Sequence, residues 1–487
     1  MPVAADSQIE LSPPLDEVRE LAREHTLVPL RHTFVADTET PVSAYLKLRG
    51  DGPSFLLESA EQGQRVGRWS FLGFRPRSVI RFERDEHPDP YAAVAEELAR
   101  YRIAQLEGLP PFAGGAVGMF GYDLVRSAEP SVGEAGPDEL ALPDLAVMIS
   151  DLLVAFDHLR HEVTVLANVL AGPDLESSYE EAARAIAGVR ERLRGPVPRA
   201  EAAVSQAPAF VANLGPDEYM AAIERAKEYI RAGDIYQVVP SRRLSADCPV
   251  EAFSIYRGLR AVNPSPYMYF LDFEDFEIAG ASPESLVKVT GRRVEQRPIA
   301  GTRPRAGSAD GDVERARELL ADEKERAEHV MLVDLGRNDL GRVCEYGSVN
   351  VDELMVIETY SHVIHIVSAV SGRLREDVTP MTALKASLPA GTLSGAPKIR
   401  AMQIIDELEP VSRGPYGGAV GYLSYTGDLD TCIYIRSALV KDGRVHLQAG
   451  AGIVADSDPA YELREADAKA GAVIEAIGLA CAQGDWA

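Results

Sequence analysis

The sequence predicts a protein of the α+β class, because segments typical of strands and segments typical of helices are both frequent. Short segments of alternating apolar residues, such as residues 69–73 and 78–83, predict strands. Segments with apolar residues along one side, such as residues 216–232, predict helices. The chain has 487 residues, of which 46% are hydrophobic, so it can bury a large core. This length suggests two or three domains, or one unusually large domain.

The first part of the chain reads mainly as strands. Residues 145–156 and 162–169 flank a polar turn at residues 157–160, as the two strands of an antiparallel pair do. Further strands are predicted at residues 54–57, 69–73 and 78–83, and helices at residues 91–105 and 178–194.

A segment rich in Pro and Ala, residues 195–214, predicts a boundary between domains. We therefore expect an N-terminal domain of residues 1–200 and a C-terminal domain of residues 214–487. After the boundary, strand signals fill most of the space between the helices. The other elements expected there are a helix at 216–232 that ends at Gly233, a strand at 235–239, and helices at 313–332 and 459–480.

One short motif occurs twice, as GGAVGMF at residues 114–120 and GGAVGYL at residues 417–423. No regular period of 20 to 50 residues accompanies it, so a solenoid is excluded. We interpret the two copies as two glycine-rich strands where backbones approach each other closely, rather than as a repeated unit.

Composition narrows the possible partners and compartments. The formal charge is −25, from 50 basic and 75 acidic residues, so the chain repels nucleic acid and anionic membranes. The N-terminus lacks a basic and apolar signal region, and no apolar run approaches the roughly 20 residues of a membrane helix. The cysteines show no CxxC spacing, which favours a reducing compartment and argues against a zinc site. We therefore expect a cytoplasmic protein. The four cysteines are Cys248, Cys344, Cys432 and Cys481.

The stretch PAGTLSGAPKIRAMQIIDELEP, residues 389–410, looks like a phosphate-binding loop. A Walker loop has four residues between its glycines and a lysine directly after the second glycine. Here three residues separate Gly391 from Gly395, and two more precede Lys398. This spacing argues against a nucleotide. The simpler alternative is a Gly/Ser turn that leads into a helix beginning near Pro397.

Several acidic residues on predicted helices are candidate metal ligands. Glu328 precedes an apolar stripe, near the C-terminal end of the helix predicted at 313–332. Glu462, Glu465 and Lys469 share one face of the last helix, which Asp458 can cap. Two carboxylates and water form a partial cage that Mg²⁺ accepts, with positions left for a substrate oxygen. The alternative is that these are ordinary solvated acids.

Other residues are suited to holding a carboxylate. The glycine-rich stretch 449–454 follows a strand, and its backbone N–H groups can form an anion-binding nest. Arg436 lies in a segment that alternates like a strand, and its planar fork fits a carboxylate; Tyr416 can add a hydroxyl. His365 alternates with apolar residues on a predicted strand, where histidine is commonly structural, and His362 should face the opposite side. Spacing thus predicts a soluble enzyme that binds a carboxylated small molecule, with Mg²⁺ as the candidate metal.

Read together, these stretches resemble the chorismate-utilising enzymes, and within them most closely the large subunits of anthranilate synthases. The similar motifs recur in the family's order and cover nearly all of the chain after residue 214. They are LLESAE (56–61), NPSPYM (263–268), ASPES (281–285), PIAGTRPR (298–305), EHVMLVDLGRNDLGRV (328–343), HVIHIVS (362–368), GTLSGAPK (391–398), YGGAVGY (416–422), DLDTCIYIRSA (428–438) and QAGAGIV (448–454).

The resemblance implies two large antiparallel β-sheets packed as a sandwich with helices outside, and a pocket for chorismate, a dicarboxylate. In such enzymes Mg²⁺ sits on two glutamates and the ring carboxylate, and the matching residues here are Glu328 and Glu465. The metal orients the ring and draws electron density toward the carboxylate as the C4 hydroxyl leaves. The family often has Thr and Asn where this chain has Ala466 and Ala468, so the surroundings of Glu465 depart from the family's pattern. The residues implied to bind substrate are Gly301, Thr302, Thr392, Tyr416, Arg436, Gly450, Ala451 and Gly452.

Two positions in the family choose the product. Enzymes that add water to chorismate have a lysine base where this chain has Gln237, and ammonia can attack without such a base. Aminodeoxychorismate synthases commonly have a nucleophilic lysine where this chain has Ala300. The resemblance therefore implies direct addition of ammonia at C2, with Glu284 as the acid and His365 linked to the later loss of pyruvate. The product would be anthranilate, the first committed intermediate of tryptophan synthesis.

The resemblance also implies a partner and an inhibitor. The four cysteines lack the tight glycine-flanked turn of an amidotransferase, so a separate glutaminase subunit, in a heterodimer or heterotetramer, would supply ammonia. The family is inhibited by L-tryptophan at a site distinct from catalysis, and the matching residues are Ser59, Pro266, Tyr267 and Met268. The N-terminal domain would contribute to this regulatory site and the C-terminal domain would be catalytic. The alternatives are an aminodeoxychorismate synthase, a nucleotide-dependent kinase or ligase, and an inactive chorismate or tryptophan sensor.

Overall fold

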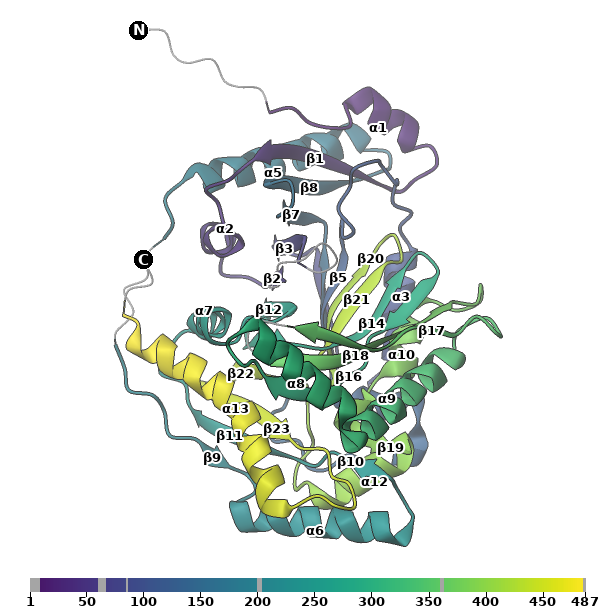
Figure 1. Ribbon diagram of the computed structural model, residues 1–487. Coiled ribbons are helices and arrows are strands. Elements are labelled where there is room, and N and C mark those ends of the chain that lie inside the picture. Colours follow the sequence, from purple (N-terminus) through teal and green to yellow (C-terminus); the bar gives the residue numbers. More distant parts are fainter. Residues whose placement is uncertain (1–8, 60–66, 85, 199–203, 360–362, 485–487) are drawn as a thin grey trace.

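The computed structural model describes residues 9–59, 67–84, 86–198, 204–359 and 363–484, and it contains two large antiparallel sheets with helices around them (Figure 1). The first sheet has eleven strands, in the order β1-β8-β7-β3-β2-β12-β13-β22-β23-β11-β9. The second has ten, in the order β16-β18-β15-β14-β21-β20-β5-β6-β4, with β17 beside β18. The predicted α+β class and the implied two-sheet arrangement are confirmed.

The strands of the first sheet have the following bounds: β1 (Leu27–Val35), β2 (Ser54–Glu58), β3 (Trp69–Phe74), β7 (Leu152–Asp157), β8 (Glu162–Leu170), β9 (Val211–Ala212), β11 (Ser241–Asp247), β12 (Tyr267–Asp272), β13 (Phe276–Ser282), β22 (Ser437–Lys441) and β23 (Arg444–Gly450). Those of the second are β4 (Ser78–Phe82), β5 (Gly115–Phe120), β6 (Leu145–Ser150), β14 (Ser285–Thr290), β15 (Arg293–Gln296), β16 (Ile299–Pro304), β17 (Asn350–Thr359), β18 (Val363–Arg373), β20 (Ala419–Ser424) and β21 (Leu429–Ile433). A two-stranded ribbon pairs β10 (Gln237–Val238) with β19 (Gly395–Ala396).

The α-helices have the following bounds: α1 (Leu15–Leu21), α2 (Pro41–Leu48), α3 (Pro90–Ala99), α4 (Val125–Ala128), α5 (Leu175–Arg194), α6 (Pro216–Ala232), α7 (Ala252–Val262), α8 (Ala309–Ala321), α9 (Glu323–Gly341), α10 (Pro380–Ser387), α11 (Gly391–Ser394), α12 (Lys398–Leu408) and α13 (Pro459–Ala482). No helix within the described residues combines the length and the apolar character needed to cross a membrane.

Both sheets combine strands from before and after the segment at 195–214. In the first sheet, for example, β2 pairs with β12, which follows it by about two hundred residues along the chain. Neither part therefore completes a sheet without the other. The division into domains at 1–200 and 214–487 stays a prediction.

The main core lies between the sheets, and a second core lies between the first sheet and its helices. Alternate residues of a strand point to opposite faces, and β12 shows this directly. Tyr269 and Leu271 belong to the core between the sheets, whereas Met268 and Phe270 belong to the core beneath α2, α5, α7 and α13. One strand thus joins two buried layers, which explains its nearly complete burial.

The two copies of the GGAVG motif are neighbouring strands, β5 and β20, and Gly118 lies opposite Gly421. A Cβ atom at Gly118 would lie 2.0 Å from the carbonyl oxygen of Ala146, so a side chain is excluded there. The interpretation as glycine-rich strands with closely approaching backbones is confirmed.

Two of the connections at which the chain passes from one sheet to the other lie next to each other. One joins β13 to β14 through Pro283 and Glu284, and the other joins β21 to β22 through residues 434–436. They are hydrogen-bonded to each other, because Ile433 N–H donates to Glu284 O and Ala281 N–H donates to Arg436 O. Polar residues on these connections are therefore held together at the junction of the two sheets.

Some predicted elements have different limits. The helix predicted at 313–332 is two helices, α8 and α9, because Asp322 ends the first and caps the second by accepting from Lys324 N–H and Glu325 N–H. Glu328 consequently lies in the first half of a helix and not near its end. The strand predicted at 235–239 is reduced to β10. The helices predicted at 216–232 and 459–480 are confirmed as α6 and α13.

Candidate active site

Arg436 and Glu284 lie on the two connections between the sheets. The prediction that Arg436 belongs to a strand was wrong: it precedes β22 with a left-handed φ of 50°, which breaks the alternation. Burial lowers the pKa of Arg436, and the nearby Glu284 carboxylate opposes this shift. Among the described residues its guanidinium has neither a hydrogen bond nor an ion pair. A buried guanidinium without a hydrogen-bonded partner is suited to binding the carboxylate of a ligand.

Glu284 is well placed to hold a proton at neutral pH. Thr392, in the loop that resembles a phosphate site, donates from Oγ1 to Glu284 Oε1 over 3.3 Å. Glu284 keeps some exposed surface, but burial of its carboxyl raises the pKa to about 8, opposed by Thr392 and by the charge of Arg436. The carboxyl is therefore mostly protonated at pH 7 and can act as an acid.

His365 lies on β18 and faces β16. Its Nδ1 lies 3.1 Å from the carbonyl oxygen of Gly301, so Nδ1 carries the proton and Nε2 holds the lone pair. Burial lowers the pKa of His365, and Arg436 lowers it further, so the ring is neutral at pH 7. Thr302 is the register partner of His365 on β16, and its side chain is outside the description. His362 also lies outside the described residues.

Glu328 and Glu465 approach each other from α9 and α13. Burial raises the pKa of Glu328, and the charge of Glu465 contributes to that rise. Gln237 Nε2 donates to Glu328 Oε1 over 3.0 Å, and Lys469 Nζ lies 2.8 Å from Glu465 Oε1. Each carboxylate already has an N–H group as a partner. Two carboxylates that converge in this way supply oxygen ligands that fit a hard divalent cation.

Gln237 is a contact that spacing alone did not predict, because it lies on the short strand β10, far from Glu328 in sequence. The side chain is 3% exposed, and its Oε1 has no partner among the described residues. A Cβ at Gly452 would lie 2.6 Å from Gln237 Nε2, so the glycine is needed to make room for the amide. An unpaired buried acceptor beside Glu328 can receive a hydrogen bond from a small polar molecule.

The residues predicted to form an anion-binding nest follow β23. Gly450 pairs with Ser241, and Ile453 exchanges two backbone hydrogen bonds with Val238. Burial raises the pKa of Tyr416 well above its usual range, and a hydrogen bond from the Gly450 backbone opposes the rise. The structure thus places Tyr416 beside Gly450, and Gly452 beside Gln237.

Near the site, one face of the last helix, α13, is buried. Glu462, on the same face as Glu465, is 4% exposed, and burial raises its pKa. Ala466 is buried against α6 and α12, whereas Ala468 is exposed. The Thr and Asn of the family's pattern are therefore replaced by one packing residue and one solvent-facing residue.

The residues predicted for tryptophan binding are also brought together. Ser59 follows β2, which pairs with β12, the strand that carries Tyr267 and Met268 after Pro266. The Ser59 hydroxyl is buried and has no partner in the part of the chain that the structure describes. Tyr267 lies opposite Ser282, two residues before Glu284. This group of residues is therefore linked to the candidate active site through one strand, β13.

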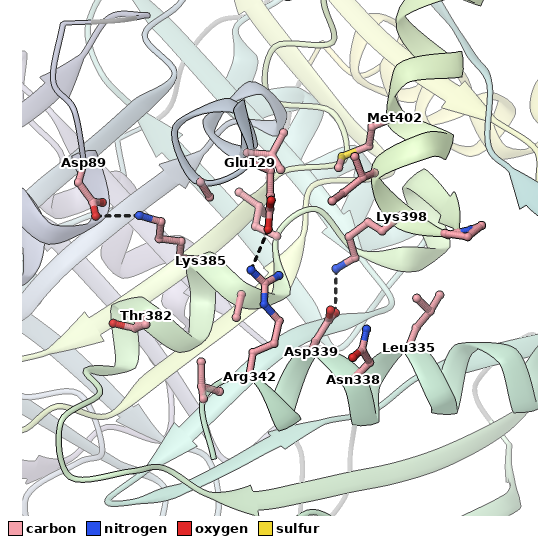
Figure 2. A pocket seen from close by; sticks show the side chains of 17 residues that line it. Asp89, Glu129, Leu335, Asn338, Asp339, Arg342, Thr382, Lys385, Lys398 and Met402 are labelled. Carbon is pink, nitrogen blue, oxygen red and sulfur yellow. Dashed lines mark hydrogen bonds and ion pairs between the residues drawn. The ribbon is translucent and has the colours of Figure 1, made fainter. Parts of the chain in front are cut away.

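Two cavities lie beside this site, and the sequence predicted neither. The larger, of about 530 Å³, is bounded by α4, α9, α10 and α12. Figure 2 shows three ion pairs around it: Asp89–Lys385, Glu129–Arg342 and Asp339–Lys398. The smaller, of about 40 Å³, reaches Glu284 and Thr392.

The comparisons with known proteins identify the family of the chain. The family model of the chorismate binding enzymes matches residues 52–475. The chain is similar to anthranilate synthase component 1 of Pseudomonas aeruginosa, with 49% identity over 95% of this chain and 98% of that one. The corresponding protein of Thermus thermophilus is 50% identical over 93% and 98% of the two chains. The crystal structure of anthranilate synthase component I from Streptococcus pneumoniae TIGR4 superposes with a TM-score of 0.77 at 39% identity, covering 91% of this chain and 99% of that one.

Proposed function

Since the chain belongs to the chorismate-binding enzymes, we propose that it converts chorismate and ammonia to anthranilate and pyruvate. The observation that carries this proposal is Gln237, which stands beside Glu328 where a water-adding enzyme needs a base. An amide cannot take a proton from water, whereas ammonia is a nucleophile without that help. The names of the relatives, anthranilate synthase component 1, support the same reaction.

The reaction balances in two steps. Ammonia forms a bond to C2 while the C4–O bond breaks, and the hydroxyl leaves as water with a proton from an acid. The C2 proton is then removed, the C3–O bond breaks, and the ring becomes aromatic as pyruvate leaves. Chorismic acid and ammonia thus give anthranilic acid, pyruvic acid and water, without an oxidant or a reductant.

The residues divide this work. Glu284, protonated at pH 7, gives its proton to the departing hydroxyl. His365, neutral with its lone pair on Nε2, accepts the C2 proton in the elimination. The substrate's enolpyruvyl carboxylate is held by Arg436, Tyr416 and the backbone of residues 450–452, and Gly301, Thr302 and Thr392 complete the pocket. Glu328 and Glu465 would hold Mg²⁺, which when bound fixes the ring carboxylate and draws electron density toward it.

The cysteines of this chain are not suited to releasing ammonia from glutamine. The cysteines are poor nucleophiles, because burial raises the pKa of Cys344 to about 11 and also raises the pKa values of Cys248 and Cys432. Cys481 is buried without any exposed surface. We therefore propose a glutaminase subunit as partner, and the designation "component 1" of the relatives supports this.

A direct assay tests the proposed reaction. The purified chain, supplied with chorismate, Mg²⁺ and an ammonium salt, should give the fluorescence of anthranilate without a glutaminase. A stable aminated product would instead indicate the aminodeoxychorismate reaction, which Ala300 opposes because it offers no nucleophile. Turnover that required ATP would support a kinase or ligase.

His365→Met is expected to separate the two steps. Methionine fills the space without accepting a proton, so ammonia addition should continue while pyruvate loss slows. Mass spectrometry should then detect an aminated, non-aromatic intermediate that still carries the enolpyruvyl group. If only unreacted chorismate remained, His365 would be needed for the first step or for the structure alone.

Ser59→Leu is expected to remove inhibition by tryptophan while leaving synthesis intact. We propose that tryptophan binds beside the adjoining ends of the paired strands β2 and β12, where the buried Ser59 hydroxyl lacks a partner among the described residues. A coupling of about 1–3 kcal/mol gives a 5- to 150-fold effect, and leucine should block the pocket. The check is the tryptophan concentration that halves the rate. Wild-type enzyme that ignores millimolar tryptophan, or a variant that remains fully inhibited, would contradict this.

A further inference from the structure

The two cavities beside the active site have walls in common. Leu335 and Asp339 line both of them. The larger cavity is bounded on its other side by exposed residues, including Asn338, Thr382 and Ile399. The smaller one reaches Glu284 and Thr392. The residues that line them extend from exposed positions beside α9 to the candidate acid.

We propose that these cavities are the entry route for ammonia, with the neck of the route at Leu335. The inference rests on the proposed function, since it assumes that the enzyme uses ammonia. It goes beyond that function in assigning a path and the residues that form it.

The size of the inner cavity selects what can pass. Its volume of about 40 Å³ has room for only a few molecules of the size of water and is far too small for chorismate. Chorismate must therefore enter elsewhere. Ammonia is the size of water, so it can use a narrow second route to reach a ring that is already in place.

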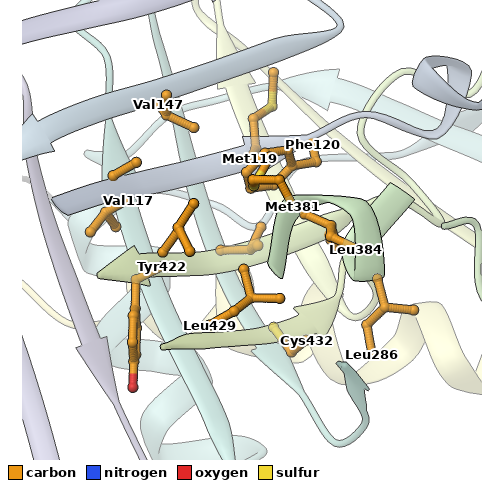
Figure 3. Packing of buried hydrophobic residues seen from close by; sticks show 14 of the residues in the cluster. Val117, Met119, Phe120, Val147, Leu286, Met381, Leu384, Tyr422, Leu429 and Cys432 are labelled. Atoms are coloured by element: carbon orange, nitrogen blue, oxygen red, sulfur yellow. The ribbon is translucent and has the colours of Figure 1, made fainter. Parts of the chain in front are cut away.

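The neck is narrow and firmly built. A Cβ atom on Gly391 would lie 2.7 Å from Leu335 Cδ1, so the two sides nearly touch. On one side Gln296 Nε2 donates to Ser387 Oγ over 2.8 Å, which fixes the end of α10. Figure 3 shows Met381 and Leu384 of α10 packed over the strands of the second sheet near Leu286, another residue of the inner cavity. The passage therefore has rigid walls, and Leu335 is the side chain best placed to close it.

The charges along the route are already paired. Lys398 Nζ lies 2.8 Å from Asp339 Oδ2 at the junction of the cavities, and Arg342 and Lys385 hold Glu129 and Asp89 at the outer one. Paired charges offer no strong site for trapping ammonium. A small neutral molecule can consequently move inward without having to break an ion pair.

Leu335→Trp tests the route by filling the neck. With saturating chorismate and Mg²⁺, the KM for ammonia should rise about tenfold or more, while the KM for chorismate and the thermal unfolding temperature stay near the wild-type values. Two variants serve as matched controls. Arg337→Trp places the same ring on the exposed side of α9, and Leu335→Ala widens the neck, so both should keep the wild-type KM for ammonia.

The possible outcomes are separable. Wild-type enzyme that makes no anthranilate from ammonium salt overturns the proposed function itself. Active wild-type enzyme with an unchanged KM for ammonia in Leu335→Trp overturns the route alone. If Leu335→Trp does not fold, Gly391→Ala narrows the same neck, and the double variant Gly391→Ala with Leu335→Ala should recover a low KM. Failure of that recovery would also overturn the route.

Discussion

Glu328→Gln and Glu465→Gln are each expected to abolish turnover while the fold stays intact. The two carboxylates converge from α9 and α13, and Glu465 raises the pKa of Glu328, so they share one local field. An amide is neutral and cannot replace a charged ligand at a site with few protein ligands. Since partners outside the ligand shell already change metal affinity or activity by 10- to 100-fold, losing a ligand should cost roughly a hundredfold or more.

The measurements are turnover as a function of Mg²⁺ concentration and binding of Mn²⁺ followed by electron paramagnetic resonance. Both variants should bind Mn²⁺ more weakly than wild type, independently of chorismate. Glu323→Gln, on the exposed first turn of α9, is the matched control and should behave as wild type. Near-normal activity at limiting Mg²⁺ in either variant would show that the glutamate concerned does not hold the metal.

Glu284→Gln is expected to lower kcat by about 10²- to 10⁴-fold, the usual contribution of a general acid. The glutamine side chain keeps the shape and can still accept from Thr392, but it has no acidic proton. A wild-type carboxyl with a pKa of about 8 is protonated below that pH, so wild-type activity should fall as the pH rises through 8. The residual activity of the variant should lack this descending limb.

Stability provides an independent check on the same carboxyl. The folded protein holds the Glu284 proton up to about pH 8, whereas the unfolded chain releases it near its ordinary value. The contribution to the free energy of unfolding therefore decreases as the pH rises between these values. Glu284→Gln should remove that part of the dependence of the unfolding free energy on pH, as measured by denaturant titrations.

For the catalytic prediction, a Glu284→Gln variant with activity within a few-fold of wild type would show that Glu284 is not the acid.

Elements with local start and stop signals could be predicted from the sequence. Asp458 and Pro459 begin α13, and the pattern of α6 ends at Gly233, so both helices were located correctly. The sequence predicted one helix at 313–332 where the structure has two, because the apolar pattern continues through Asp322. The capping role of Asp322 depends on its rotamer and on the turn around it, which the pattern does not show. Arg436 was misplaced for a different reason: a strand that changes sheets keeps its apolar composition but loses its alternation.

The candidate site residues could be predicted from the sequence, but the contacts between them could not. Gln237 meets Glu328 across 91 residues of sequence, and no local pattern records such a meeting. The resemblance to chorismate-utilising enzymes supplied the expected roles of Glu328, Glu465 and Arg436. The cavities were not predictable, because a void depends on how helices pack and not on what any one helix contains. Leu335 looks in the sequence like one more apolar residue of α9.

The most direct test of the whole account is the identity of the products formed from chorismate and ¹⁵N-labelled ammonium with Mg²⁺ present. The account predicts anthranilate that carries the label, with one pyruvate formed for each anthranilate, and no accumulation of an aminated intermediate in the wild-type enzyme. Isochorismate would show that water is the nucleophile despite Gln237. A labelled product that retained the enolpyruvyl group would show that the enzyme stops before the elimination assigned to His365.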